Sequence, residues 1–286
     1  MSVLDSITRL VKDPPPAHVF ELSEAGVAYS IRGHVAFERL PEGALVPSPV
    51  DDNLKRPEAI SSLLLSIVTP NGGKKRTPAS LILPDFAARV TVLDFDSFPS
   101  AAEEQASLVK FRVKKTIPFD IDSAAVRYFV QPESSKKKKI EVVAVTVALD
   151  ILAKYEALFR NAGFQAGEIT TSGIAALNLW KVSETAVIAK LVGKVLSVMV
   201  VSGRNLKLFR CLSLEDSSDE EVLSILLPTF AYAEDELGTP VRRVVLCGFD
   251  RAPQGLPVEV ETLHTRAGIV NPYSAGLAGY LEGMGA

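Results

Sequence analysis

The sequence predicts an α/β protein built from two lobes that share one order of elements. Apolar runs of strand length occur in groups of three, and each group is followed by a stretch of helical periodicity and then by a further buried strand. This β-β-β-α-β order begins at residue 18 and begins again at residue 186. Repetition on the scale of a domain indicates two lobes of common architecture. A chain of 286 residues is long enough to give each lobe a core of its own.

The first repeat is preceded by a short amphipathic segment. Residues 1–13 carry apolar side chains at helical spacing, and three prolines at 14–16 end that predicted helix. Pro57 stands where a helix begins, which suits its fixed backbone angle. The strands and helix of the first repeat are expected at 18–22, 27–32, 35–40, 57–68 and 79–83.

The second repeat has clearer signals for the start and the end of its helix. Ser218 and Glu221 form a capping box at the start of its helix, and Gly238 follows the helix end. Pro228 lies inside this helix and should kink or split it. The strands and helix of the second repeat are expected at 186–191, 195–201, 206–212, 219–237 and 241–247.

The apolar stretch 186–202 has the length of a short membrane span. A helix there would place Lys190 and Lys194 in hydrocarbon, at a cost of about 2.5–3.5 kcal/mol each. Gly193 divides the stretch into two halves of strand length. We therefore expect two strands joined by a turn, and no membrane span.

A block of a different order, β-α-β-β-α, separates the two repeats. Ser100 and Glu103 have the spacing of a capping box, which predicts the start of its first helix, and Gly163 is expected to end its second. Its elements are expected at 89–95, 102–113, 124–130, 140–148 and 150–162, and a last helix at 174–182 would link the lobes. We predict a first lobe of residues 1–83, an inserted α+β subdomain of 84–168, a link of 169–185 that completes the first lobe, and a second lobe of 186–286.

Composition excludes several classes of protein. Hydrophobic residues make up 47% and charged residues 23%, which is typical of a globular chain. The formal net charge of −3 gives no sign of nucleic-acid binding. The two cysteines, Cys211 and Cys247, lie in apolar runs without a CxxC pair, and the three histidines have no metal-binding spacing. Residues 1–17 lack an unbroken apolar core, so we expect no signal peptide and a location inside the cell.

Particular residues then indicate which known protein family the sequence resembles. Two β-β-β-α-β lobes with a linking helix are the plan of the actin-like and sugar-kinase superfamily. The run from Leu83-Pro84-Asp85 to Ile117-Pro118-Phe119 resembles the PilM family of bacterial type IV pilus assembly proteins, and the Ile117-Pro118-Phe119 step is its most specific part. The resemblance is strong from 79 to 180 and looser at both ends. It implies a two-lobed actin-like fold with ribonuclease H-like lobes, an inserted α+β subdomain and a reduced fourth subdomain.

The resemblance also implies a partner. In the PilM family, a PilN-like membrane protein inserts its short N-terminal cytoplasmic tail into a groove beside the inserted subdomain, so the family is cytoplasmic and is held at the inner membrane. Aromatic residues and a proline at the ends of predicted elements would line that groove, although each ring could instead fill the core of the subdomain. These candidates are Phe86, Phe95, Phe98, Pro118 and Phe119.

The PilM family binds ATP between its lobes with two Asp-x-Gly hairpins, and this sequence departs from that pattern. Glu21 and Ser23 stand where the first aspartate and glycine should be, and Leu191 replaces the second aspartate, although Gly193 is retained. Gly248-Phe249 stands in place of a Gly-Gly step, so Phe249 would crowd the nucleoside. Gly193 with Lys190 and Lys194 could still hold an anion. We therefore expect a degenerate ATP site with no catalytic residue and no metal.

Three functions remain open at this stage. The first is a scaffold for pilus assembly that has no cofactor and forms no contact with nucleic acid. The second is an active ATPase that uses ATP and Mg²⁺ to switch its affinity for a partner. The third is a platform protein of type II secretion, which shares the actin-like plan. Homo-oligomers are compatible with each of them. The lysine run 136–139 reads as a solvated turn or as a contact with anionic lipid.

Overall fold

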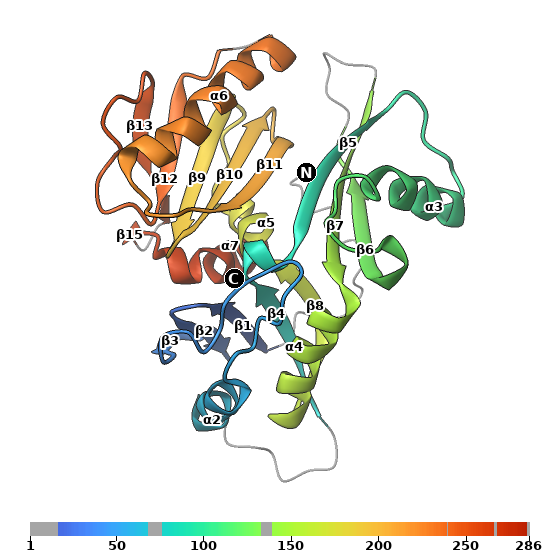
Figure 1. Cartoon of the computed structure of the whole chain (residues 1–286), viewed down its shortest axis with the longest axis vertical. Helices are drawn as coiled ribbons and strands as arrows, with labels where there is room; N and C mark the ends of the chain where they lie inside the picture. The colour runs from blue at the N-terminus through green and yellow to red at the C-terminus, as the bar shows by residue number, and fades with distance from the viewer. Residues whose placement is uncertain (1–16, 68–75, 133–138, 239, 266–267, 285–286) are drawn as a thin grey trace.

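The computed structural model describes residues 17–67, 76–132, 139–238, 240–265 and 268–284. It contains two five-stranded sheets, a three-stranded sheet beside them, and helices that cover the sheet faces (Figure 1). The helix expected at 1–13 and most of the lysine run lie outside the described residues. Among the described residues, no helix is long and apolar enough to cross a membrane. The stretch from 186 to 202 instead forms two paired antiparallel strands, as predicted.

The first sheet has the strand order β3-β2-β1-β4-β8. Its first three strands form an antiparallel meander, while β4 runs parallel to β1 and β8 runs parallel to β4. The strands are β1 (His18–Ser23), β2 (Gly26–Ile31), β3 (His34–Arg39), β4 (Thr77–Leu83) and β8 (Phe164–Thr171).

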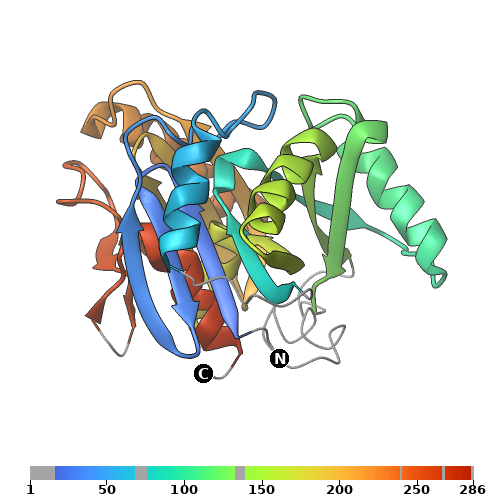
Figure 2. The same cartoon turned by 90° about the horizontal axis from the view of Figure 1, so that it is seen from below.

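Helices cover both faces of this sheet. Helices α2 (Pro57–Ile67) and α4 (Leu149–Asn161) lie over one face, where the rings of Phe20, Phe159 and Phe164 pack together. Figure 2 shows these two helices on one side of the sheet and α7 on the other. Helix α7 (Ala275–Gly283) packs there against α5 (Ser172–Ala176). This approach is so close that a side chain at Gly279 would collide with the backbone of Ala175.

The second sheet repeats the plan with the order β11-β10-β9-β12-β13. Helix α6 (Asp219–Leu237) covers one face and continues through Pro228 without a split. Its capping box forms as predicted, because Ser218 Oγ accepts a hydrogen bond from the Glu221 N–H, and Gly238 ends the helix with a φ of 60°. The strands are β9 (Ala186–Val192), β10 (Val195–Ser202), β11 (Asn205–Ser213), β12 (Arg243–Cys247) and β13 (Glu259–Thr262), followed by the short pair β14 (His264–Thr265) and β15 (Gly268–Ile269).

The third sheet has the order β5-β7-β6 and joins the two lobes. Helix α3 (Ala102–Val113) packs on one face through Val109 and Val113. The other face contributes Phe129 and Val143 to a core shared with the second lobe. The strands are β5 (Arg89–Phe95), β6 (Ala124–Val130) and β7 (Ile140–Ala148).

Two expected elements differ from the structure. The strand β8 was not predicted, because it lies at a sheet edge and only its first and last residues are buried, which removes the usual alternation. The linking helix expected at 174–182 is instead the short α5 followed by a 3₁₀ turn at Leu177–Leu179. Helix α4 and strand β8 also pack with the first lobe, although α4 and the first part of β8 fall in the expected insert of 84–168. The packing therefore favours a narrower insert, close to 89–148, which we call the insert below.

Candidate functional site

Two β-hairpins, one from each lobe, face each other between the two five-stranded sheets. The first is the turn between β1 and β2, and the second is the turn between β9 and β10. The Glu24 carboxylate of the first turn accepts a hydrogen bond from the Lys194 backbone N–H of the second. It also leaves no room for a Cβ at Gly193, whose φ is 54°. A turn of this conformation presents its N–H groups to an anion, and here the chain itself supplies that anion.

Glu21 lies deeper in the same place and is bound by helix α7. Its carboxylate accepts hydrogen bonds from the N–H groups of Gly276 (3.2 Å) and Leu277 (2.7 Å), where the helix dipole favours negative charge. The Ser172 hydroxyl donates a third hydrogen bond. Burial raises the pKa of Glu21 to about 7. Helix α7 and Ser172 therefore occupy the positions from which a bound ligand could reach this carboxylate.

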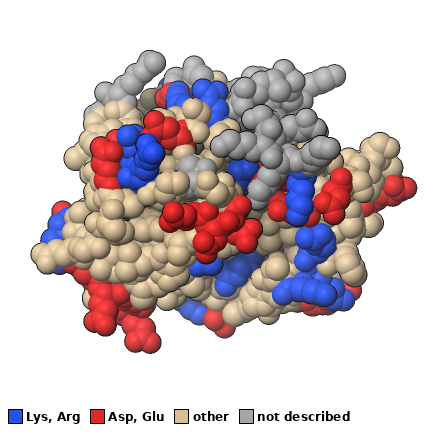
Figure 3. All heavy atoms as spheres, turned by 90° about the horizontal axis from the view of Figure 1, so that it is seen from above, with Lys and Arg blue, Asp and Glu red and all other residues tan. Residues whose placement is uncertain are grey.

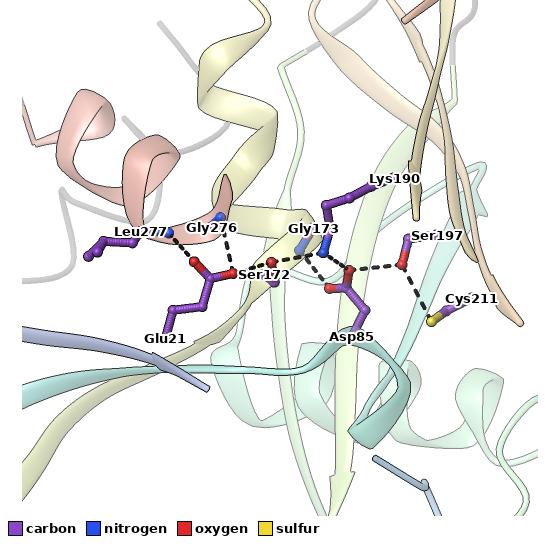
Figure 4. Close-up of polar contacts among 9 residues, drawn as sticks. All are labelled: Glu21, Asp85, Ser172, Gly173, Lys190, Ser197, Cys211, Gly276 and Leu277. Carbon is purple, nitrogen blue, oxygen red and sulfur yellow. Dashed lines mark hydrogen bonds and ion pairs between the residues drawn. The ribbon is translucent and has the colours of Figure 1, made fainter. Parts of the chain in front are cut away.

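Lys190 reaches across from the second lobe and forms a buried ion pair with Asp85 (Figure 4). Its Nζ lies 3.0 Å from Asp85 Oδ2 and donates to Ser172 Oγ over 2.9 Å. Burial acts to lower the pKa of Lys190, but the carboxylates of Asp85 and Glu21 outweigh it, so the pKa is raised. Lys190 is therefore a fixed cation between the two lobes.

The other lone pairs of Asp85 are also satisfied. The Gly173 N–H donates to Asp85 Oδ1 over 2.6 Å, and the Ser197 hydroxyl donates to Oδ2 over 2.8 Å. A buried ion pair is stable only when such additional hydrogen bonds offset the free-energy cost of removing both charges from water. These contacts join the end of β4, the start of α5 and two strands of the second sheet. We call the five residues that make them the interlobe cluster, namely Glu21, Asp85, Ser172, Lys190 and Ser197.

Little space remains between the hairpins. The hollow lined by the interlobe cluster and by Ser23, Glu24 and Phe86 has a volume of about 20 Å³. Such a volume admits about one water molecule. Small-molecule sites usually measure about 300–1,000 Å³, so a nucleotide does not fit without separation of the hairpins.

Of the residues predicted at a degenerate nucleotide site, Glu21 and Ser23 line this hollow. Ser23 lines the hollow and donates a hydrogen bond to the Gly26 carbonyl, which closes the first hairpin. Leu191 and Phe249 pack into the core under α6 and not into the hollow. Gly248, with a φ of 83°, passes so close to the Leu191 carbonyl that a side chain would collide there.

Sequence reasoning missed most of the interlobe cluster. As a site residue, Lys190 was considered only as part of an anion site, and Asp85 was noted only as part of a family motif. The available signals were a lysine inside an apolar strand and an aspartate directly after a buried strand, since ionised side chains are seldom buried without a partner. The partner of each could not be read from the sequence, because the residues that meet lie far apart along the chain.

A second candidate site is a groove between the first lobe and the insert. It has a volume of about 600 Å³, and Val50 and Leu149 line it with half of their side chains exposed. The loop that carries Val50 is fixed by Asn53, whose Oδ1 accepts a hydrogen bond from the buried Tyr155 hydroxyl. We call it the tail groove, and its lining residues are Val50, Pro118, Phe119, Asp122, Ser123, Ala148, Leu149 and Asp150.

The structure separates the five residues predicted to bind a partner. Pro118 and Phe119 line the tail groove, and Phe119 packs against the cores of both the first lobe and the insert. Phe95 and Phe98 lie in the core of the insert with ring centroids 5.0 Å apart. Phe86 lies beside Asp85 under the guanidinium of Arg89. Partner binding by any of them stays a prediction.

These two lobes, with their repeated sheets and a site between facing hairpins, define an actin-like ATPase fold. No protein-family model matches the chain, and no curated protein sequence matches it. Solved structures do match it along almost its whole length. A chain of the PilM–PilN type IV pilus biogenesis complex has a TM-score of 0.70 at 14% identity, covering 95% of this chain and 99% of that one.

Two further structures have the same fold. The cytoplasmic domain of EpsL, an inner-membrane component of the type II secretion system of Vibrio cholerae, has a TM-score of 0.56 at 12% identity, covering 92% of this chain and 94% of that one. A protein of unknown function with an actin-like ATPase fold, from Bacteroides thetaiotaomicron, has a TM-score of 0.52 at 12% identity, covering 93% and 97%. The fold class predicted from the sequence is thus confirmed, and so is the likeness to PilM–PilN.

Replacing Lys190 by Met should strongly destabilise the protein. The change leaves the buried Asp85 carboxyl group without its cation, and breaking a buried pair in this way costs about 3–5 kcal/mol. Lys154→Met is the control, because Lys154 forms an exposed pair with Asp52 whose loss costs about 0–1 kcal/mol. Urea unfolding of both variants measures the difference, and equal losses would contradict the role given to Lys190.

The contribution of Glu21 to the free energy of unfolding should fall as the pH rises from about 4.5 to about 7. Glu21 loses its proton near pH 4.5 in the unfolded chain but near pH 7 in the folded one, so the folded state holds the extra proton only in this window. The contribution is about 3 kcal/mol. Unfolding free energies measured across this range should decline less steeply for Glu21→Gln than for the wild type. Parallel curves for the two proteins would show that Glu21 does not titrate in this way.

Proposed function

We propose that the protein is a cytoplasmic scaffold of a type IV pilus or related assembly machine, and that it works without ATP turnover. In this proposal it binds the cytoplasmic tail of a PilN-like inner-membrane protein in the tail groove. The observation that carries the proposal is that Glu24 and Lys190 fill the site between the lobes. A protein whose lobes are held together by its own charges has no need of a nucleotide to fix their arrangement.

The shape and chemistry of the tail groove support its role. Extended peptides bind such grooves through backbone hydrogen bonds, with pockets that select apolar side chains. Val50, Phe119 and Leu149 offer apolar surface for this purpose, and Asp122 and Asp150 stand at the same groove. An apolar tail that carries an arginine or lysine would complement these side chains. A chain of the same fold comes from a complex named for PilM and PilN, which is consistent with a membrane partner.

The chemistry of the site between the lobes supports the absence of turnover. Phosphoryl transfer depends on Mg²⁺ and on backbone groups that hold the phosphates. Here the Lys194 N–H is bound to Glu24, and the cation between the two lobes is an ammonium group that cannot act as a metal does. Glu21, which replaces the first aspartate, is held by α7.

A second candidate function is a platform of a type II secretion system. The specific observation is the shared fold with the cytoplasmic domain of EpsL over nearly the full length of both chains. The two candidates use the same scaffold without turnover and differ in the membrane partner. Binding assays with tails from both kinds of partner distinguish them, and the tail that binds the groove identifies the machine.

Phe119→Ala should weaken binding of the tail. The probe is a synthetic, extended apolar peptide that carries one arginine, the chemistry expected of the tail. We expect a loss of about 1–3 kcal/mol, as at other buried interface anchors. Phe111→Ala is the matched control, because Phe111 is 66% exposed on α3 and does not line the groove. Titration of both variants, with circular dichroism to confirm folding, tests the site. Equal affinity of Phe119→Ala and wild type would remove Phe119 from it.

The purified protein should neither bind nor hydrolyse ATP. Isothermal titration with ATP and Mg²⁺ should give no heat of binding, because Glu24, Lys190 and α7 occupy the site. Release of phosphate should stay at the background rate. Steady turnover that Gly193→Ala abolishes would overturn the proposal and favour an ATP-driven switch.

A further inference from the structure

A second groove lies between the insert and the second lobe, and it shares no lining residue with the tail groove. Its volume is about 330 Å³, and the strands β5 and β11 form its two walls. The side chain of Tyr232 on α6 and that of Thr116 after α3 complete its lining. We call it the cationic groove because of the charges described next.

The groove is lined by three cations, Arg89, Lys207 and Arg210, and by no carboxylate among its described lining residues. Lys207 is already neutralised, because it forms a buried ion pair with Glu141. Arg210 lies over the ring of Tyr232 with its guanidinium carbon 6.0 Å from the ring centroid. Arg89 is therefore the cation of greatest interest.

Arg89 is half-buried and forms no ion pair with any residue that the structure describes. Its guanidinium lies 5.1 Å from the ring centroid of Phe86, and its Nη1 donates to the Ala88 carbonyl over 3.1 Å. Burial lowers its pKa, which reflects the cost of withdrawing the charge from water. These contacts fix the direction of the guanidinium while leaving most of its N–H donors without a carboxylate.

Part of the backbone of each wall is available as well, beyond the stretch where β5 and β11 lie against each other. Strand β5 is an end strand of the three-stranded sheet, and β11 is an end strand of the second sheet. Within the described part of the chain, neither pairs with another strand on its open side. Free strand edges present N–H and C=O groups that pair with an added strand.

The walls of the groove are held rigidly to each other. The side chain of Gln131 pairs with the backbone of Leu206 through two hydrogen bonds of 2.7 Å, so that it acts as a short piece of strand. Asn205 adds hydrogen bonds to Glu141 and to the Pro132 carbonyl. A preformed groove lowers the entropy cost of binding a flexible partner.

We propose that the cationic groove binds an extended, acidic segment of a second protein partner, which pairs with one strand edge and places a carboxylate on Arg89. Arginine binds carboxylates through two parallel hydrogen bonds, and such pairs are stronger than neutral ones. The two grooves would then select different partners, since acidic side chains line the tail groove and cationic ones line this groove.

The charges around the groove favour a peptide over a nucleic acid. The carboxylates of Asp94 and Glu236 act on Tyr232, so the cationic surface does not extend far beyond the groove itself. Figure 3 shows that acidic and basic side chains both occur over the face seen from above, and that neither sign covers it. A nucleic-acid site would present a broader basic field.

The test uses a peptide of alternating valine and glutamate as the probe, and one of alternating valine and lysine for comparison. Fluorescence anisotropy should show binding of the glutamate peptide only. Arg89→Met should weaken that binding by about tenfold or more, as expected for the loss of a charge-assisted pair. Arg127→Met is the matched control, because Arg127 is exposed on β6 at the opposite edge of the same sheet and also donates to a neighbouring carbonyl.

Hydrogen exchange on the wild-type protein gives a readout that does not depend on the variants. Bound glutamate peptide should protect backbone amides in Arg89–Phe95 or Asn205–Ser213 and leave those in Ala124–Val130 unchanged. The proposal is overturned if the glutamate peptide does not bind, if the lysine peptide binds equally well, or if Arg127→Met weakens binding as much as Arg89→Met. Tighter binding of a single-stranded oligonucleotide that displaces the peptide would also overturn it.

Discussion

The ion pair between Lys190 and Asp85 is the interaction on which the arrangement of the two lobes depends. It joins the end of β4 to β9, and the hydrogen bonds of Ser172 and Ser197 complete it on either side. Replacing such a pair by apolar residues can be neutral for stability. The role of the pair is therefore to fix one arrangement of the two lobes. With Glu24 bound to the second hairpin, the lobes carry their own cation and their own anion at the place where they meet.

The insert packs against both lobes and so helps to hold them in one arrangement. One face of its sheet packs with α3, the other shares a core with the second lobe, and Phe119 ties it to the first. The insert therefore contacts both lobes and forms a wall of each groove. Relative motion of the lobes would disturb Gln131, Glu141 and their partners on β11. The proposed scaffold would present two grooves of different charge and would need no cycle of nucleotide binding to hold them in place.

Local sequence patterns predicted most of the fold. Hairpins, the capping box at Ser218 and the break at Gly193 depend on residues near one another, and each formed as expected. Strand β8 was not predicted, because an edge strand lacks a fully buried face.

The site was predicted only in outline. Glu21 and Ser23 were placed beside it, but the contact of Glu21 with Ser172 joins residues 151 positions apart, and that of Ser197 with Asp85 joins residues 112 apart. Such contacts depend on the tertiary fold and leave no local pattern.

The central claim is that the site between the lobes is filled by the chain itself. A crystal structure of the protein soaked with ATP and Mg²⁺ tests this claim most directly, because it reports the position of every charged group in the site. The account predicts no nucleotide between the hairpins, with Lys190 still bound to Asp85 and the Glu24 carboxylate still on the Lys194 N–H. A nucleotide bound there, with Glu24 displaced and its phosphates at the Gly193 turn, would contradict it.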